Sequence, residues 1–293
     1  MKDLTVGKER NQILNFAAPM ILGQLFQQVY VIIDSIIVGN YLGPDALAAV
    51  GTSIPIIFLL ISLAVGITNG ATILIAQYFG FKDYNKISSA IDTINVFLLI
   101  ASILISTVGI IFCHDIFLLI NLPESIMPLA EKYMTIYFYG LYGMFGFYGI
   151  AAILRGAGDS KTPLYFQIFA SVLNIVLDIV FVVYLKKGVE GVAYSTIIAQ
   201  GITFIISVVY LHINNPLIKF KILNLKFDSS VFYQSIRIGI PSGLQQAFVS
   251  LGMMAIFRIV NGFGPGVIAA YSIVSRIEMF ASMPTMNLSI ALS

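Results

Sequence analysis

The sequence predicts an all-α protein that crosses a membrane several times. Of its 293 residues, 58% are hydrophobic and only 10% are charged, and the mean hydropathy is +0.94. A soluble domain is about 45–50% apolar and about 25% charged, so its core could not hide this much apolar surface. The apolar residues also gather in runs of the roughly 20 residues that a helix needs to cross a bilayer.

Eight such runs are the expected membrane helices. In chain order they lie near residues 13–38, 46–79, 91–113, 133–154, 163–185, 191–212, 236–260 and 267–293. Turn and charge signals separate successive runs, in the order NYLGPD, FGFKDYNK, NLPESIMP, RGAGDSKTP, KKGVEG, NNPLIKFKILNLKFDSS and NGFGPG. Glycine, proline and charged residues in these segments are typical of loops at the membrane surface.

Lysine and arginine set the orientation of the helices. With residues 1–12 placed in the cytoplasm, cytoplasmic segments hold eleven basic residues and outer segments hold four. Cytoplasmic loops carry the excess of basic residues, so a cytoplasmic N-terminus is predicted. The net charge of +2 is too small to predict nucleic-acid binding. The single cysteine, Cys113, excludes an intrachain disulfide and is expected to be a small buried hydrophobe.

An internal repeat relates the two ends of the chain. NFAAPMILGQ at 15–24 aligns with RIGIPSGLQQ at 237–246, so Pro19 recurs as Pro241 at a spacing of 222 residues. NYLGPDALAA at 40–49 aligns with NGFGPGVIAA at 261–270 at a spacing of 221. Each copy comprises six helices, which is an even number, so both copies have the same orientation. This predicts a parallel repeat.

The repeat predicts the domain organisation. Residues 13–212 would form an N-terminal lobe of six helices, 213–235 a cytoplasmic linker, and 236–293 the first two helices of a repeated C-terminal lobe. A complete second copy would carry the chain to roughly 440 residues. We therefore expect a truncated chain.

Ionisable side chains are rare inside the apolar runs. They are Asp34, Asp178, Arg276, Glu278 and, near an inner end, Asp92. An acid at a helix centre costs about 2.5–3.5 kcal/mol on insertion scales, so such residues face a bundle interior or a water path. A hydrogen bond between packed helices is the simpler alternative, although Asn or Ser would supply it at lower cost.

Three oxygen-bearing side chains are expected to share one level in the outer half of the membrane. At 1.5 Å per residue, Asp34, Asp178 and Thr196 lie about 6, 10 and 8 Å below the outer surface. Asn174 lies one turn below Asp178 on the same helix face. These hard oxygens suit H⁺ or Na⁺, so we predict a cation site, with metal ligands only if the ion is Na⁺.

Other polar residues continue from this level into the bundle. Four of them share helix stripes with the predicted ligands and are expected to line a substrate cavity: Gln27, Tyr30, Gln200 and Thr203. Pro19 removes a backbone hydrogen bond inside the first helix, which predicts a kink or hinge. Helix bundles also accommodate prolines for packing alone.

Two glycine motifs predict other functions but lie in the wrong context. Residues 156–159 match the GxGD pattern of intramembrane aspartyl proteases, in which the acid must lie within a span. Asp159 instead lies between Arg155 and Lys161 in a turn, which argues against a protease. GFGPG at 262–266 has no strand before it, so a nucleotide-binding role is not expected.

The sequence is similar to the multidrug and toxic compound extrusion (MATE) family over the whole chain. The resemblance rests on AAPMILGQL, VIIDSIIVGNYLGPDALAAVG, LRGAGDSKTP, NIVLDIVFV and GVAYSTIIAQ, in that order. It implies twelve helices in two six-helix lobes that form a V, with the substrate path between them. It also implies a multi-pass protein in the plasma (inner) membrane of a prokaryote, and we expect a monomer.

The resemblance assigns roles to particular residues. In the DinF-like branch, the first-lobe cation site matches Asp34, Asn174, Asp178 and Thr196, and the first helix bends at the proline matching Pro19. NorM-like members carry a glutamate on helix seven where this chain has Val249, so the second-lobe site of that branch is absent there. Arg276 and Glu278 either contact substrate or neutralise neighbouring charges.

These observations predict a secondary antiporter and not an enzyme. It would export small-molecule drugs and organic cations in exchange for H⁺ or Na⁺, with no cofactor besides the coupling ion, and both ions remain candidates. The alternative is a lipid-linked oligosaccharide flippase of the same superfamily. A flippase would line its cavity with several Arg or Lys, and the first six predicted helices have none in mid-span.

Overall fold

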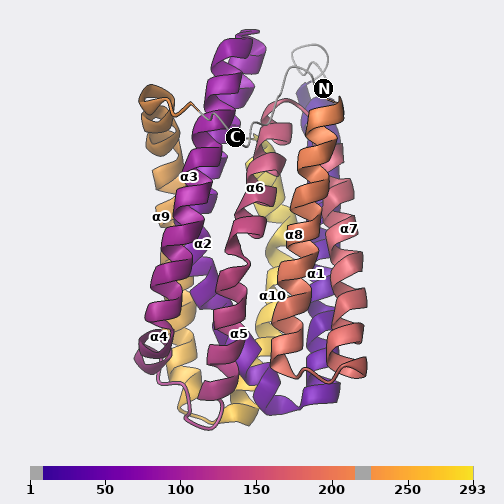
Figure 1. Cartoon of the computed structure of the whole chain (residues 1–293), viewed down its shortest axis with the longest axis vertical. Helices are drawn as coiled ribbons and strands as arrows, with labels where there is room; N and C mark the ends of the chain where they lie inside the picture. The colour runs from indigo at the N-terminus through magenta and orange to yellow at the C-terminus, as the bar shows by residue number, and fades with distance from the viewer. Residues whose placement is uncertain (1–8, 215–225, 293) are drawn as a thin grey trace.

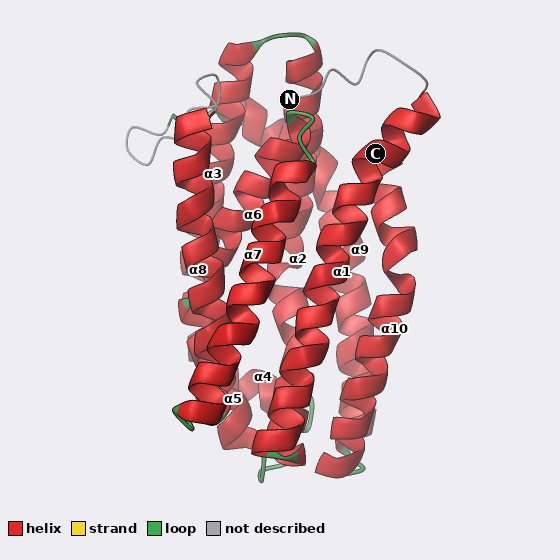
Figure 2. Ribbon diagram, turned by 90° about the vertical axis from the view of Figure 1, so that its right-hand side faces the viewer, coloured by secondary structure: helices red, strands yellow, loops and turns green. Residues whose placement is uncertain are grey.

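The computed structural model describes residues 9–214 and 226–292, and nearly all of this portion of the chain is helical (Figure 1). The long helices run along the long axis of the molecule, and Figure 2 shows no strand among the described residues. The predicted all-α class is therefore confirmed. The elements are α1 (Glu9–Leu42), α2 (Pro44–Gly80), α3 (Tyr84–Ile111), α4 (Cys113–Leu119), α5 (Met127–Tyr139), α6 (Leu141–Gly156), α7 (Lys161–Asp178), the π-helix η1 (Ile179–Tyr184), α8 (Val189–Asn214), α9 (Ser229–Asn261) and α10 (Pro265–Leu292).

Most of the predicted membrane runs fall within these helices, and the run at 91–113 passes from α3 into the start of α4. Among the described residues, six helices are long and apolar enough to cross a membrane, and the bent pair α5 and α6 would make a seventh. The run predicted at 133–154 as one helix is this pair, which bends by 53° at Gly140. A Cβ on Gly140 would lie 2.2 Å from Cγ2 of Ile197 on α8, so only glycine fits this close contact.

The helices begin earlier than their apolar runs, and two of them extend into the predicted terminus and linker. α1 begins at Glu9, before the run expected from 13, and α9 begins at Ser229, inside the predicted linker 213–235. Asp228 explains the second difference, because its carboxylate accepts hydrogen bonds from the backbone nitrogens of Ser230 (2.9 Å) and Val231 (3.2 Å) and so caps the helix. Residues 1–8 and 215–225 of the expected terminus and linker lie outside the described residues, and the division into lobes remains a prediction.

Burial separates a packed interior from an apolar exterior. Phe117, Phe138 and Phe145 are almost fully buried in the core, and Cys113 is buried as expected. Large apolar side chains are exposed on the outside of the bundle, including Leu104 of α3, which is 62% exposed. Such an exposed apolar surface suits contact with lipid.

The helix packing brings the predicted site residues together. α1 packs along α7 and also contacts α8, and α7 packs along α8. In Figure 2, α1 and α7 run side by side on the face turned to the viewer. α9 packs along α2 over most of its length, which places the first helix of the predicted second repeat against the first repeat.

Candidate cation-binding site

The predicted ligands meet where α1, α7 and α8 pack together. Asp178 at the end of α7 is fully buried, and Asn174, one turn earlier, is 4% exposed. Asp34 of α1 and Thr196 of α8 are half-buried. Asp34 lies close enough to Asp178 for their charges to repel each other.

Asn174 links α7 to α8 and to the neighbouring acid. Its amide satisfies both sides when the nitrogen donates to Asp178 Oδ2 at 3.0 Å and the oxygen accepts from the backbone nitrogen of Thr196 at 3.3 Å. In the opposite orientation, the amide nitrogen lies 3.4 Å from Thr196 Oγ1. In either orientation Asn174 lies against Thr196, although the depth argument had matched Thr196 with Asp178.

Ser195 is a site residue that the sequence reasoning missed. It is fully buried, and its hydroxyl donates to Asp178 Oδ1. The same hydroxyl lies 2.8 Å from the Val192 carbonyl oxygen, which competes for its single proton. Ser195 could have been predicted from its place next to Thr196, because two successive helix residues can both face one neighbouring helix.

The backbone changes form at Asp178. α7 ends there, and a π-helix continues from Ile179 to Tyr184, with Leu185 N donating to Val180 O at 2.9 Å. Wider π-helical turns inside membrane helices often occur at functional sites. This segment was predicted only as the end of an α-helical run, because apolar residues give no pattern that distinguishes the two kinds of turn.

The residues predicted to line a substrate cavity lie on the expected helices. Tyr30 lies within electrostatic reach of both acids. Gln27 lies beside Tyr148 of α6, a neighbour that the sequence did not predict. Gln200 is 8% exposed, and its Oε1 is buried without a protein hydrogen-bond partner among the described residues. The cavity role of these residues remains a prediction.

Thr203 and Pro19 occupy packed positions. Thr203 is fully buried and donates to the Ala199 carbonyl oxygen of its own helix at 2.7 Å. Pro19 is buried in α1, which continues through it as one helix from Glu9 to Leu42. Their roles in substrate binding and in bending therefore remain predictions.

Three other charged residues drew attention in the sequence: Asp159, Glu278 and Arg276. Asp159 accepts hydrogen bonds from the backbone nitrogens of Lys161 and Thr162, both at 3.0 Å, and from the Thr162 hydroxyl at 2.6 Å. It therefore orders the start of α7, which accounts for the glycine motif without a protease. Glu278 is exposed on α10, and the side chain of Arg276 lies outside the described residues.

Comparisons with known proteins give the same family as the sequence resemblance. The sequence model of the MatE family matches residues 19–180. The chain is 36% identical to the probable multidrug resistance protein YpnP of Bacillus subtilis, over 97% of this chain and 63% of that protein. It is 34% identical to YoeA of the same organism, also named a probable multidrug resistance protein, over 95% of this chain and 62% of the relative.

Solved structures agree in fold. The chain matches an outward-facing multidrug resistance MATE family transporter with a TM-score of 0.86 and 25% identity, over 97% of this chain and 63% of the other. It matches an inward-facing one with a TM-score of 0.83 and 26% identity, over 90% and 60% of the two chains. The relatives are named as transporters and not as enzymes, and this chain spans about 63% of the length of YpnP. With its family pattern, its fold and its relatives in agreement, the chain belongs to the MatE family.

Proposed function

We propose that this chain carries the ion-coupling site of a multidrug efflux antiporter, which exports amphipathic, often cationic compounds in exchange for H⁺ or Na⁺. The observation that supports this most is the meeting of Asp34 and Asp178 from two helices at a largely buried point. Two acids held together inside a membrane bundle are costly, and such residues usually mark ion paths. The names of the Bacillus relatives support drug export as the transported chemistry.

The site residues have distinct roles in this proposal. Asp34 and Asp178 exchange the coupling cation, because neutralising them relieves both their mutual repulsion and the cost of burying charge. Asn174 and Thr196 supply neutral oxygens beside the acids. Ser195 holds Asp178 Oδ1 through its hydroxyl, which leaves Oδ2 on the side of Asn174.

Transport follows from competition for the acids. A cationic substrate and the coupling ion cannot both neutralise the same carboxylates, so the arrival of one promotes release of the other. We propose that neutralisation also changes the packing of α1 on α7, with Pro19 as the weak point of α1. A membrane potential that is negative inside adds about 2.3 kcal/mol of driving free energy per 100 mV for each positive charge that enters.

The test is efflux of a fluorescent cation such as ethidium by the complete gene product in vesicles. H⁺ and Na⁺ gradients are imposed separately, so the experiment also identifies the ion. Asp178→Asn should remove gradient-driven efflux while the protein still inserts and is recovered in normal amount. Undiminished efflux by this variant would disprove the coupling role of Asp178.

A further inference from the structure

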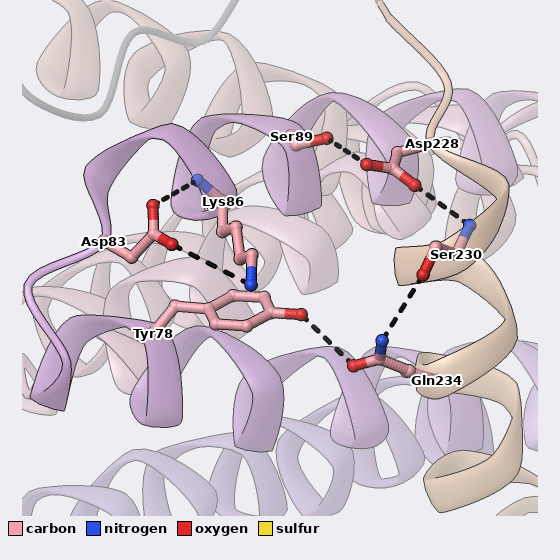
Figure 3. Close-up of polar contacts among 7 residues, drawn as sticks. All are labelled: Tyr78, Asp83, Lys86, Ser89, Asp228, Ser230 and Gln234. Carbon is pink, nitrogen blue, oxygen red and sulfur yellow. Dashed lines mark hydrogen bonds and ion pairs between the residues drawn. The ribbon is translucent and has the colours of Figure 1, made fainter.

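A second polar cluster joins the two predicted repeats at the end of the bundle that holds the N-terminus, the predicted cytoplasmic end. Figure 3 shows its two sides, with the hairpin between α2 and α3 on one and the start of α9 on the other. Residues 226–234, the described second part of the predicted linker, lie against α2 and α3. We call this segment and its contacts the latch.

Every contact of Asp228 in the latch is a hydrogen bond of ordinary length. Its Oδ2 accepts from the Ser89 hydroxyl at 3.0 Å while its Oδ1 caps α9. Its backbone nitrogen donates to Thr93 Oγ1 at 3.0 Å, so Asp228 is fixed to α3 through both its side chain and its backbone. The backbone N–H of Val231, followed by the Ser89 hydroxyl, holds the pKa of the Asp228 carboxyl below its ordinary value.

Weaker contacts extend the latch on both sides. The backbone nitrogen of Lys226 lies 3.5 Å from Asp92 Oδ2, and the other oxygen of this 3% exposed carboxylate has no protein hydrogen-bond partner in the described chain. Tyr78 donates to Gln234 Oε1 at 3.2 Å. The latch therefore lies at the end of the bundle and consists mainly of separate polar contacts, with two apolar contacts beside them: Val231 is 4% exposed, and the ring of Phe232 lies 5.6 Å from that of Phe97 on α3.

Beyond the latch, α9 packs on α2 in a different way. A Cβ on Gly70 would lie 2.3 Å from the Ser235 carbonyl oxygen, and one on Gly66 would lie 2.5 Å from the Cα of Gly243. The two backbones thus touch through small residues spaced four apart, as in close pairs of membrane helices. At the far end of α9, Asn261 donates to the Ile120 carbonyl oxygen at 2.7 Å.

We propose that the latch is a releasable closure of the predicted cytoplasmic face, and that residues 226–234 move off α3 while α9 from Ser235 onward stays on α2. This inference rests on the proposed transport function. Opening would exchange the hydrogen bonds for water and expose two apolar side chains, Val231 and Phe232. Breaking the glycine contacts would instead separate a closely packed pair of backbones. Solved MATE relatives exist in outward-facing and inward-facing forms, so a family member must open and close each face.

Cysteine cross-linking tests the proposal, because Cys113 is the only cysteine in the sequence. In a Cys113→Ala background, Ser89→Cys with Asp228→Cys is joined by a short bis-thiosulfonate reagent. Cross-linking should reduce ethidium efflux by about tenfold, and reductant should restore it. A control pair, His114→Cys with Glu131→Cys, joins two side chains in contact within the first predicted lobe and should tolerate cross-linking. Full activity of the cross-linked Ser89–Asp228 pair would show that the latch is a static anchor and overturn the proposal.

A second readout separates failure of the latch from failure of the transport function. Thr93 is 1% exposed and lies under Asp228, so a Thr93→Cys thiol can react with a maleimide only when the latch opens. Labelling in purified protein should proceed slowly and should quicken about fivefold with Ser89→Ala. If labelling follows this pattern but the protein shows no ion-driven efflux, the proposed function fails and the latch stands. Labelling that Ser89→Ala leaves unchanged would count against the latch itself.

Discussion

Two aspartates of this protein each accept a hydrogen bond from a serine of another helix, and they differ in everything else. Asp178 is fully buried between α7 and α8, beside a second acid and Ser195. Asp228 lies at the end of the bundle with Ser89. Asp228 also accepts hydrogen bonds from two backbone N–H groups, and its pKa lies below the ordinary value. Its negative charge is therefore already balanced by donors.

The difference separates a structural acid from one suited to bind a cation. In the described portion of the chain, the ion pairs are Lys86 with Asp83, His114 with Glu131 and Lys132 with Glu190, and none of them includes Asp178. Asp178 therefore has donors from one hydroxyl and one amide but, among the residues that the structure describes, no basic partner within ion-pair distance. An incompletely balanced buried carboxylate next to another acid favours a mobile cation, whereas a capped one favours a fixed helix.

The largest expected effect is on the acid pair itself. Asp34→Asn and Asp178→Asn should each reduce ion-driven efflux to the level of vesicles without the protein, and the double variant should be no worse, because the two acids act as one unit. Asp228→Asn should keep most of the efflux. If Asp228→Asn were as inactive as Asp178→Asn at equal protein levels, the distinction between a structural acid and a cation-binding acid would be wrong.

Removing the serine of the buried pair should have the next largest effect. A hydrogen bond to a charged group is worth about 1.5–3 kcal/mol, so Ser195→Ala should change the ion concentration for half-maximal efflux by about tenfold or more. The change should be toward lower concentration, because a carboxylate that loses a donor binds a cation more tightly. Ser195→Thr keeps the hydroxyl and should restore the normal value.

Ser207 offers the matched control for this measurement. It is also fully buried on α8, but its hydroxyl donates to the Phe204 carbonyl oxygen of its own helix at 2.7 Å. Ser207→Ala should leave the half-maximal ion concentration unchanged. Equal shifts in the two alanine variants would mean that Ser195 acts only through packing.

The helices and the positions of the four residues of the candidate site could be predicted for clear physical reasons. Long apolar runs must become helices in a bilayer, and the depth of Asp34, Asp178 and Thr196 follows from a fixed rise per residue. The bend at Gly140 could not be predicted, because it depends on contact with Ile197 of a helix distant in sequence. The π-helix after Asp178 was missed because its residues are uniformly apolar.

The latch escaped prediction for the opposite reason. Asp228 lies in a polar segment that composition assigns to a linker, and neither Ser89 nor Thr93 stands out in the sequence. Only the packing of α9 along α2 brings these residues together. Sequence periodicity finds costly residues inside apolar helices far more readily than ordinary polar residues at their ends.

Ser89, which donates to Asp228, should have a smaller effect than the fully buried Ser195. Asp228 keeps its two backbone donors in Ser89→Ala and water can replace the hydroxyl, so the variant should change steady ethidium efflux by about threefold or less. Ser89→Thr should keep the hydroxyl bond and the wild-type rate. A loss as large as that of Ser195→Ala, at equal expression, would remove the distinction between the two serines.

The smallest effect within the working pH range should be that of protonating Asp228. Its pKa is lowered in the folded protein, so its contribution to holding 226–234 is fully present above the unfolded value of about 3.9 and is lost as pH falls through the folded pKa. Hydrogen exchange of this segment, corrected for intrinsic rates, should therefore be flat from about pH 5 to about pH 8 and rise only in stronger acid. Asp228→Asn should abolish the acid-dependent rise. A change in wild-type protection near neutral pH that Asp228→Asn removes would mean that Asp228 senses protons, which would make it the same kind of acid as Asp178.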